Sequence, residues 1–190
     1  MSRDPRRIWI VAAAVLAVCA VAPRAWASSA TLTNALGCRK ALTTVGRNYY
    51  GKRLGLLLNC ADRLLTCEVQ LEVDGTNPGK CRSSAADACT LYLGSAADSK
   101  LSKAAQAFHD KTALACIAFD IGPMLSTVAG GLWFGNDATC AGSADVPTLV
   151  DCVRGEIEKL ADQSAGEAKP RAALLLDNIG LGSNFPNLPR

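Results

Sequence analysis

The stretch that decides the fold is CRKALTTVGRNYYGKRLGLLLNCADRLLTC, residues 38–67. Apolar residues recur in it at intervals of three and four, the spacing that keeps one face of an α-helix apolar. The pattern continues on both sides and predicts one long amphipathic helix over residues 33–73. Its inward face is expected to contain Cys38, Leu42, Val45, Tyr49, Leu56, Cys60, Leu64 and Cys67.

The three cysteines of this helix need partners elsewhere in the chain. At 100° per residue, Cys60 lies about 40° around the helix from Cys38, and Cys67 about 20° back from Cys60, so all three point the same way. Cys38 and Cys60 are nevertheless about 33 Å apart along the helix axis, which no disulfide can span. Each cysteine therefore requires a partner on another element.

A dense turn sequence, DGTNPG at residues 74–79, sends the chain back along the first helix. Beyond it we expect a short helix over about 84–93 and a longer one over about 96–120. Two Ser-x-x-Asp sequences, beginning at Ser84 and Ser95, resemble N-terminal capping boxes in which Asp replaces the usual Glu. They are the predicted starts of these two helices.

An antiparallel hairpin predicts which cysteines pair, because paired positions then have a nearly constant sum of residue numbers. Three pairs satisfy this condition, with sums of 154, 149 and 148, and the last two cysteines are left to pair locally. The predicted disulfides are Cys38–Cys116, Cys60–Cys89, Cys67–Cys81 and Cys140–Cys152.

The first 27 residues have the pattern of a secretory signal peptide. A basic head is followed by an uninterrupted apolar stretch over residues 8–22 and by a small-x-small end, Ala25-Trp26-Ala27. We expect cleavage after Ala27. The apolar stretch is shorter than the roughly 20 residues that a membrane-spanning helix needs, so we expect no stable transmembrane span once the signal is removed.

A lipid anchor is the minority alternative. Leu16-Ala17-Val18-Cys19 resembles a lipoprotein box, in which a small residue normally precedes the lipidated cysteine. Val18 is branched and bulky for that position. We therefore expect a secreted or periplasmic protein rather than one anchored through Cys19.

Cysteine usage fits such an oxidising compartment. Eight cysteines remain beyond residue 27, and an even number in an exported chain indicates disulfides. The two closest are Cys60 and Cys67, so no C-x-x-C sequence occurs. Thioredoxin-like redox motifs, zinc knuckles and c-type haem attachment are therefore excluded.

The distribution of charge argues against a nucleic-acid partner. The formal net charge is +3, but residues 1–27 hold four arginines and one aspartate, which leaves 16 basic and 16 acidic residues in 28–190. A nucleic-acid-binding domain usually carries a basic excess. Residues 38–66 are basic and residues 137–177 are acidic. The simplest interpretations are that the late helices dock against the first helix or that both faces are solvated, and a binding site for an acidic partner stays open.

The remainder of the chain completes one all-α domain over residues 28–181. A helix is expected over about 147–165 and a last short one over 172–176. Residues 113–135 are apolar and glycine-rich and are interpreted as a helix end with a connecting loop, although a cavity wall or a membrane-inserting segment stays open. Residues 182–190, which contain two prolines, are expected to form a C-terminal tail.

No group of residues forms a recognisable active site. His109 is the only histidine, so a Ser-His-Asp, Cys-His or conventional zinc site would have to use it. Its neighbour Asp110 is expected to point about 100° away on a helix. Glu156 and Glu158 face different sides of a helix and are interpreted as solvent-exposed. We expect no enzymatic activity, no catalytic residues, no cofactor and no metal.

An aromatic and basic cluster lies in the middle of the first helix. Tyr49 belongs to the inward stripe, so the cations near it are expected at the surface. Tyr50, Lys52 and Arg53 are therefore candidates for contacting a partner.

A family pattern runs through residues 35–120. It consists of Cys38-Arg39-Lys40-Ala41, Tyr49-Tyr50, Lys52-Arg53-Leu54 and Cys60, followed by the turn, Cys81, Cys89 and a helix rich in Ala and Lys. This pattern resembles a loose group of exported, cysteine-rich helical proteins of environmental bacteria. The resemblance implies a mainly helical exported domain and supplies no catalytic residues.

These observations predict an exported, non-enzymatic helical module that binds a protein or a cell-envelope component, or that acts structurally. The alternative is a periplasmic or extracellular carrier of a lipid or small apolar ligand, in which residues 113–135 would line a cavity.

Overall fold

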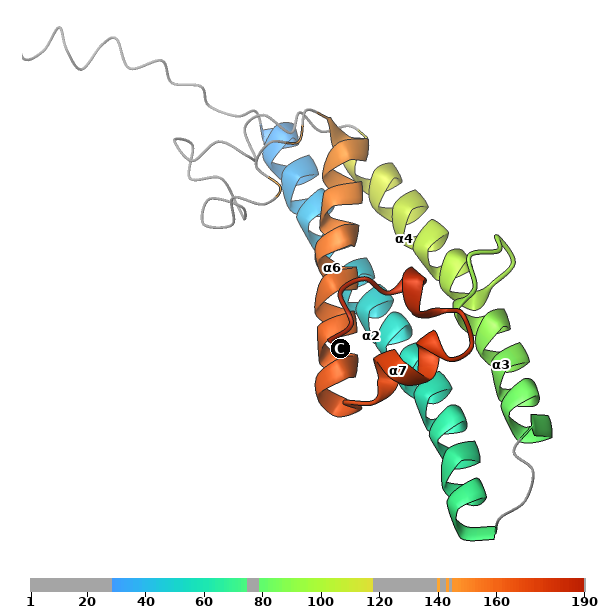
Figure 1. Ribbon diagram of the computed structural model, residues 1–190. Coiled ribbons are helices and arrows are strands. Elements are labelled where there is room, and N and C mark those ends of the chain that lie inside the picture. The colour runs from blue at the N-terminus through green and yellow to red at the C-terminus, as the bar shows by residue number, and fades with distance from the viewer. Residues whose placement is uncertain (1–28, 75–78, 118–139, 141–142, 144, 190) are drawn as a thin grey trace, which may run out of the picture.

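The computed structural model describes residues 29–74, 79–117, 140, 143 and 145–189. The predicted signal peptide, Cys19 and most of the segment 113–135 lie outside these residues. All regular structure in the described part of the chain is helical, which confirms the predicted all-α, disulfide-stapled class. The elements are α2 (Ser29–Asp74), α3 (Gly79–Leu93), α4 (Lys100–Cys116), α6 (Val146–Ala168), α7 (Ala172–Asp177) and the 3-10 helix η2 (Gly182–Asn184) (Figure 1).

Helix α2 organises the whole molecule. At 1.5 Å per residue its 46 residues extend about 70 Å. Helices α3 and α4 together run back along it and form the second arm of a hairpin (Figure 1). The inward stripe expected from the sequence is buried, with Val45 partly so. The spacing of three and four therefore places one continuous face of α2 against both helices of the return arm.

Three disulfides cross the hairpin at successive levels. They join Cys38 to Cys116, Cys60 to Cys89 and Cys67 to Cys81, and a fourth joins Cys140 to Cys152, with Cα–Cα separations of 4.7–5.7 Å. The three hairpin pairs are those derived from the sums of residue numbers, and the fourth is the local pair that the remaining two cysteines were expected to form. The sums work because α3 and α4 follow α2 antiparallel along their whole length.

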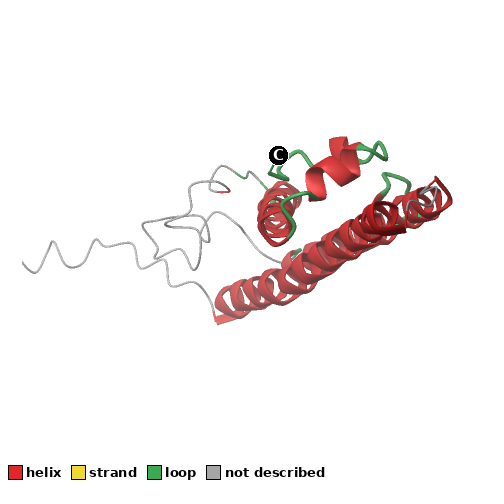
Figure 2. Ribbon diagram, turned by 60° about the horizontal axis from the view of Figure 1, so that its bottom comes forward, coloured by secondary structure: helices red, strands yellow, loops and turns green. Residues whose placement is uncertain are grey.

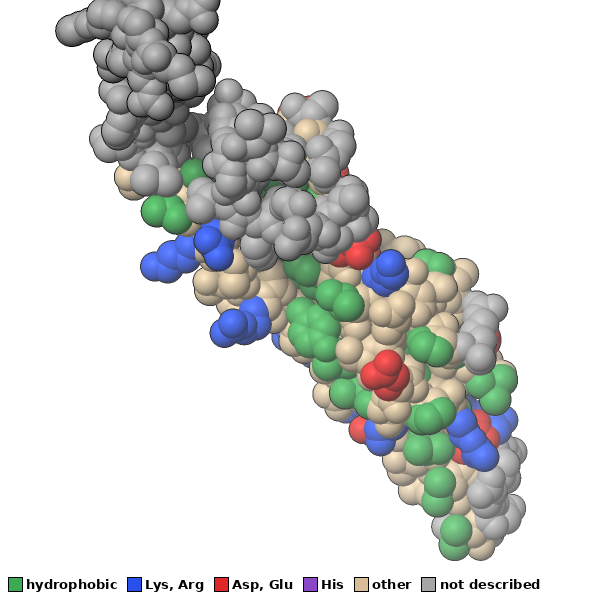
Figure 3. Space-filling view, turned by 90° about the vertical axis from the view of Figure 1, so that its left-hand side faces the viewer, with side chains coloured by type: hydrophobic (Ala, Val, Ile, Leu, Met, Phe, Trp, Pro, Cys, Tyr) green, Lys and Arg blue, Asp and Glu red, His purple; other side chains and the backbone are tan. Residues whose placement is uncertain are grey.

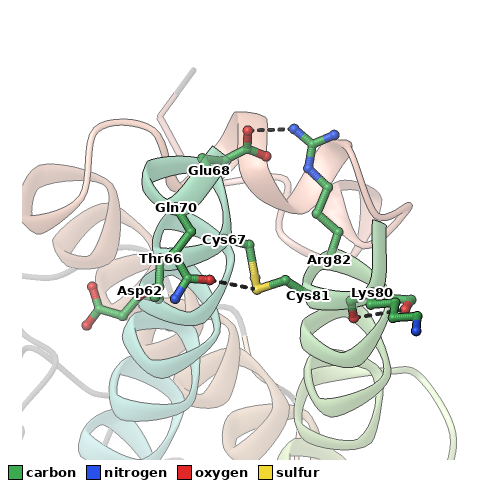
Figure 4. Close-up of a disulfide and its surroundings, with 9 residues drawn as sticks. Asp62, Thr66, Cys67, Glu68, Gln70, Lys80, Cys81 and Arg82 are labelled. Carbon is green, nitrogen blue, oxygen red and sulfur yellow. Dashed lines mark hydrogen bonds and ion pairs between the residues drawn. A yellow bond between two sulfur atoms is a disulfide. The ribbon is translucent and has the colours of Figure 1, made fainter. Parts of the chain in front are cut away.

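The disulfide nearest the hairpin turn is reinforced by charge. Figure 4 shows Cys67 on α2 bonded to Cys81 on α3, with Arg82 Nη2 donating to Glu68 Oε2 at 2.6 Å beside it. Gln70 Oε1 lies 3.7 Å from Cys81 Sγ. Both arms are thus held together at the end of the hairpin where the chain reverses.

Helices α6 and α7 cover one side of the hairpin. Figure 2 shows both of them on the same side of α2, and no described helix lies on the opposite side. Leu149, Val150 and Val153 are buried where α6 packs. Gly46 permits the close approach of α6, because a Cβ atom there would lie 3.0 Å from Ile157 Cδ1.

The two predicted capping boxes are not helix starts. Helix α3 begins at Gly79, so Ser84 lies inside it, and α4 is capped by Ser99 rather than Ser95. The Ser102 N–H donates to Ser99 Oγ at 3.1 Å, and the extended backbone of Ser99 is the conformation that an N-cap requires. Helix α3 begins earlier than predicted, at Gly79 rather than near Ser84. Its first turns contain Cys81, which the disulfide to Cys67 holds against α2.

The C-terminal residues 182–189 pack against the helices, contrary to the predicted tail. Leu181, Phe185 and Leu188 are buried, and the Phe185 ring lies over the Arg53 guanidinium with Cζ 5.0 Å from its centroid. Contacts with the helices explain the difference, since Phe185 lies against Arg53 of α2 and Pro189 lies against Gly166 of α6. The segment closes the domain over the junction of α2 and α6.

Candidate functional site

A buried ion pair joins α2 to α6. Arg53 Nε donates to Asp162 Oδ1 at 2.7 Å, and Arg53 Nη2 donates to Asp162 Oδ2 at 3.0 Å. The two side chains are 6% and 0% exposed. Glu158 Oε2 lies 3.7 Å from Arg53 Nη1 and adds a second carboxylate at the edge of the pair. This is the bidentate arrangement in which a planar guanidinium matches a carboxylate best.

Tyr49 extends the same network towards α4. Its hydroxyl donates to Glu158 Oε1 at 2.6 Å, and its ring stacks on Phe108 with 5.5 Å between centroids. Burial raises the pKa of Tyr49, and the hydrogen bond and charge of Glu158 raise it further. The phenol is therefore held in its neutral, donating form.

Burial and ion pairing have opposite effects on the pKa values of Arg53 and Asp162. Burial opposes the charge of Arg53, but its hydrogen bonds and attraction to Asp162 outweigh that effect and raise the pKa of the guanidinium. Burial raises the pKa of the Asp162 carboxyl, and Arg53 offsets part of this rise. Each charge is thus tolerated in the interior because the other is there.

The predicted partner-binding cluster does not form one surface. Arg53 is buried in the ion pair, and the Tyr50 hydroxyl donates to Ser164 Oγ at 2.9 Å, so both residues bind α6. Lys52 is exposed on a different face. The correction follows from helix geometry, since consecutive residues point 100° apart and the three positions cannot share one direction.

The interpretation of Glu158 as a solvent-exposed residue is wrong, because its side chain binds Tyr49 and borders Arg53. The sequence pattern did not single out Asp162. The sequence feature that could have indicated their contact with α2 is spacing. Glu158 and Asp162 are four residues apart, and each follows an apolar residue, Ile157 or Ala161. Acids so placed on an amphipathic helix lie at the edge of its packed face.

His109 is partly exposed on α4 and takes no part in this network. Its Nδ1 atom lies 3.5 Å from Asp110 Oδ1, so the neighbouring carboxylate is closer than the helical direction predicted. Gln106 Nε2 donates to the same carboxylate oxygen at 2.7 Å. Among the described residues, no three of His, Cys, Asp and Glu lie close enough together to hold a metal ion.

The surface carries shallow grooves between helices. One of about 490 Å³ lies between α2, α3 and α7 and includes Leu64, Arg82 and Ile179. A second, of about 350 Å³, is lined mainly by apolar side chains of α2 and α7. A third, of about 290 Å³, lies between α2 and α4. None of the described helices combines the length and hydropathy that crossing a membrane requires.

Comparisons with protein-family models, with curated proteins and with solved structures found no match.

Proposed function

We propose that this chain is an exported, non-enzymatic helical module that binds a protein or a component of the cell envelope. The observation that carries the proposal is that the buried polar side chains of the described residues bind one another. Tyr49, Arg53, Glu158 and Asp162 bind one another, and no described buried side-chain nitrogen or oxygen lacks a partner. These groups fasten α6 to the hairpin, which is a structural task.

The covalent framework supports binding by a rigid surface. Three disulfides fix the two arms of the hairpin at three levels, so surface residues on α2 and α4 keep their relative positions. Binding costs less conformational entropy when the contacting residues are already ordered. Four disulfides are also compatible with an oxidising compartment, which supports export.

Unpaired cations supply the chemistry for a partner. Residues 29–61 of α2 contain five cations and no acid. Eight exposed cations of α2 and α4 form no ion pair with a described carboxylate, and Figure 3 shows Lys and Arg side chains along the upper left edge with no Asp or Glu coloured beside them. The eight are Arg39, Lys40, Arg47, Lys52, Arg63, Lys100, Lys103 and Lys111, of which Arg63 and Lys100 lie over the Tyr92 ring. An acidic partner would be attracted to this part of the molecule.

Site-specific photo-cross-linking of the full chain in its exporting host tests the proposal. A photoreactive residue is placed at Lys40, at Lys111 and, as a control on the acidic side, at Glu167. We expect a discrete adduct from the basic positions and weaker or no labelling from Glu167. The proposal is contradicted if no position yields an adduct and the purified protein instead retains a lipid or another small molecule.

A further inference from the structure

We propose that the face of the α2–α4 hairpin opposite α6 is a docking groove for an acidic amphipathic helix of a partner protein. This inference rests on the proposed binding function and adds the chemistry of the partner. The hairpin groove is defined by Val45, Asn48, Tyr49, Lys52, Ala104, Ala107, Phe108 and Lys111.

The hairpin groove has a small apolar floor between two cations. Val45, Ala104 and the buried aromatic residues Tyr49 and Phe108 form the floor, and Lys52 and Lys111 are exposed at its rim. Its volume of about 290 Å³ lies at the lower limit of the roughly 300–1,000 Å³ usual for small-molecule pockets. The short alanine side chains allow another backbone to approach closely. A row of side chains from a helix fits such a groove better than a whole small ligand.

The molecule already binds one acidic amphipathic helix on the other side of the same hairpin. There α6 buries Leu149, Val150 and Val153, and it places Glu158 and Asp162 against Tyr49 and Arg53. Tyr49 takes part on both sides, because its ring lines the groove while its hydroxyl reaches α6. Both faces therefore combine apolar side chains with cations, a buried Arg53 towards α6 and the exposed Lys52 and Lys111 at the groove.

Only one of these faces is occupied in the described structure. Lys52 points about 100° away from Arg53, whose side chain binds α6. Figure 2 shows α6 and α7 on a single side of α2. Neither Lys52 nor Lys111 forms an ion pair with a described carboxylate. An incoming helix with acids on either side of an apolar stripe would pair with both lysines and cover the floor.

Fluorescence anisotropy with a defined peptide tests this inference on the full disulfide-bonded chain. The probe is a labelled helical peptide of about five turns with a Leu/Ala stripe flanked by Glu, and its matched control carries Lys at the Glu positions. We expect the acidic peptide to bind with a Kd on the order of 10–100 μM at low salt, and more weakly as salt rises, because the interaction is partly electrostatic. We expect the basic peptide not to bind.

Charge-reversal variants locate the binding. Lys52→Glu combined with Lys111→Glu is expected to raise the Kd about tenfold or more, whereas Lys80→Glu combined with Arg171→Glu, exposed cations outside the groove with the same change in net charge, should alter it less than about twofold. Circular dichroism confirms that each variant is folded. The inference is overturned if both double variants lose binding equally, or if the acidic peptide does not bind.

A lipid surface is the competing occupant, and vesicles distinguish it. Binding to phosphatidylglycerol vesicles that disappears in the Lys52→Glu, Lys111→Glu variant, without peptide binding, would assign the groove to an anionic membrane and overturn the inference. Photo-cross-linking separates this failure from failure of the proposed function. A protein adduct from Lys40 but none from Ala107 would leave the module function standing and refute the groove.

Discussion

The Arg53 guanidinium and the Asp162 carboxylate are joined by two hydrogen bonds in the interior, although they lie 109 positions apart in the chain. One belongs to the hairpin and the other to the helix that covers it. The net contribution of such a pair is small, because desolvation offsets most of the attraction, but either charge alone is costly. The pair therefore specifies where α6 docks on α2.

Removing Asp162 alone should strongly destabilise the protein. Asp162→Ala leaves the Arg53 guanidinium buried without its partner, and we expect a loss of about 3–5 kcal/mol in the free energy of unfolding. Urea unfolding with the disulfides intact measures this loss.

Two control variants separate the buried charge from other effects. Arg53→Met combined with Asp162→Leu should lower the free energy of unfolding much less, since neither charge of the pair is left in the interior. Asp151→Ala, which breaks only the exposed pair with Arg154, should cost less than about 1 kcal/mol. Similar losses in both single variants would refute the role of the buried pair.

The stability should fall at high pH because of Tyr49. Its pKa in the folded protein is raised above the ordinary value of 10.0, so its contribution is complete below about pH 10. Above that pH the unfolded chain releases the phenolic proton while the folded chain retains it, and the stability decreases. Urea unfolding from pH 8 to pH 11 should show a steeper loss for the wild type than for Tyr49→Phe. Parallel curves would mean that Tyr49 is not buried as described.

A pair of glycines on α6 tests the packing of the C-terminal segment. A Cβ atom at Gly166 would clash with the Pro189 ring, whereas one at Gly155 meets nothing. We expect Gly166→Ala to destabilise the protein by about 1–3 kcal/mol. Gly155→Ala should stabilise it by up to about 1 kcal/mol, the usual gain for this change in an exposed helix. Thermal melts of the two variants measure the contrast, and stabilisation by both would place residues 182–189 away from α6.

Stepwise reduction should open the hairpin from its turn. Cys81 is partly exposed, whereas Cys38, Cys116, Cys60 and Cys89 are all 0% exposed. A mild thiol reductant should therefore cleave Cys67–Cys81 before the two fully buried disulfides of the hairpin, Cys38–Cys116 and Cys60–Cys89. Alkylation and peptide mapping would show the order of cleavage. Early loss of Cys60–Cys89 would contradict the nested arrangement.

The covalent pattern was predictable from the sequence because a hairpin of helices has simple geometry. Once α2 was assigned, Cys38, Cys60 and Cys67 required partners in reverse order, and the chain offered one set of nearly constant sums. Capping was less predictable. Ser84, Ser95 and Ser99 all satisfy local N-cap preferences, but Ser99 alone caps a helix, and Ser84 lies inside α3, whose first turns contain the disulfide-bonded Cys81.

The buried polar network could not be derived from single-helix patterns. Arg53 lies among other cations on α2, and only its partner on α6 distinguishes it from Lys52. The burial of Phe185 could not be predicted either, since it lies in a segment whose prolines indicate irregular structure. Its ring contacts the guanidinium of Arg53, a residue far away in the sequence. Both features arise from contacts between distant segments.

The intact native mass of the protein exported by its own host is the most direct test of the account as a whole. The account predicts the mass of residues 28–190 less eight hydrogens, one pair for each disulfide, with no small molecule bound. Additional mass that leaves on denaturation would contradict the binding module in favour of a carrier. A chain that begins at a lipidated Cys19 would contradict the predicted cleavage after Ala27.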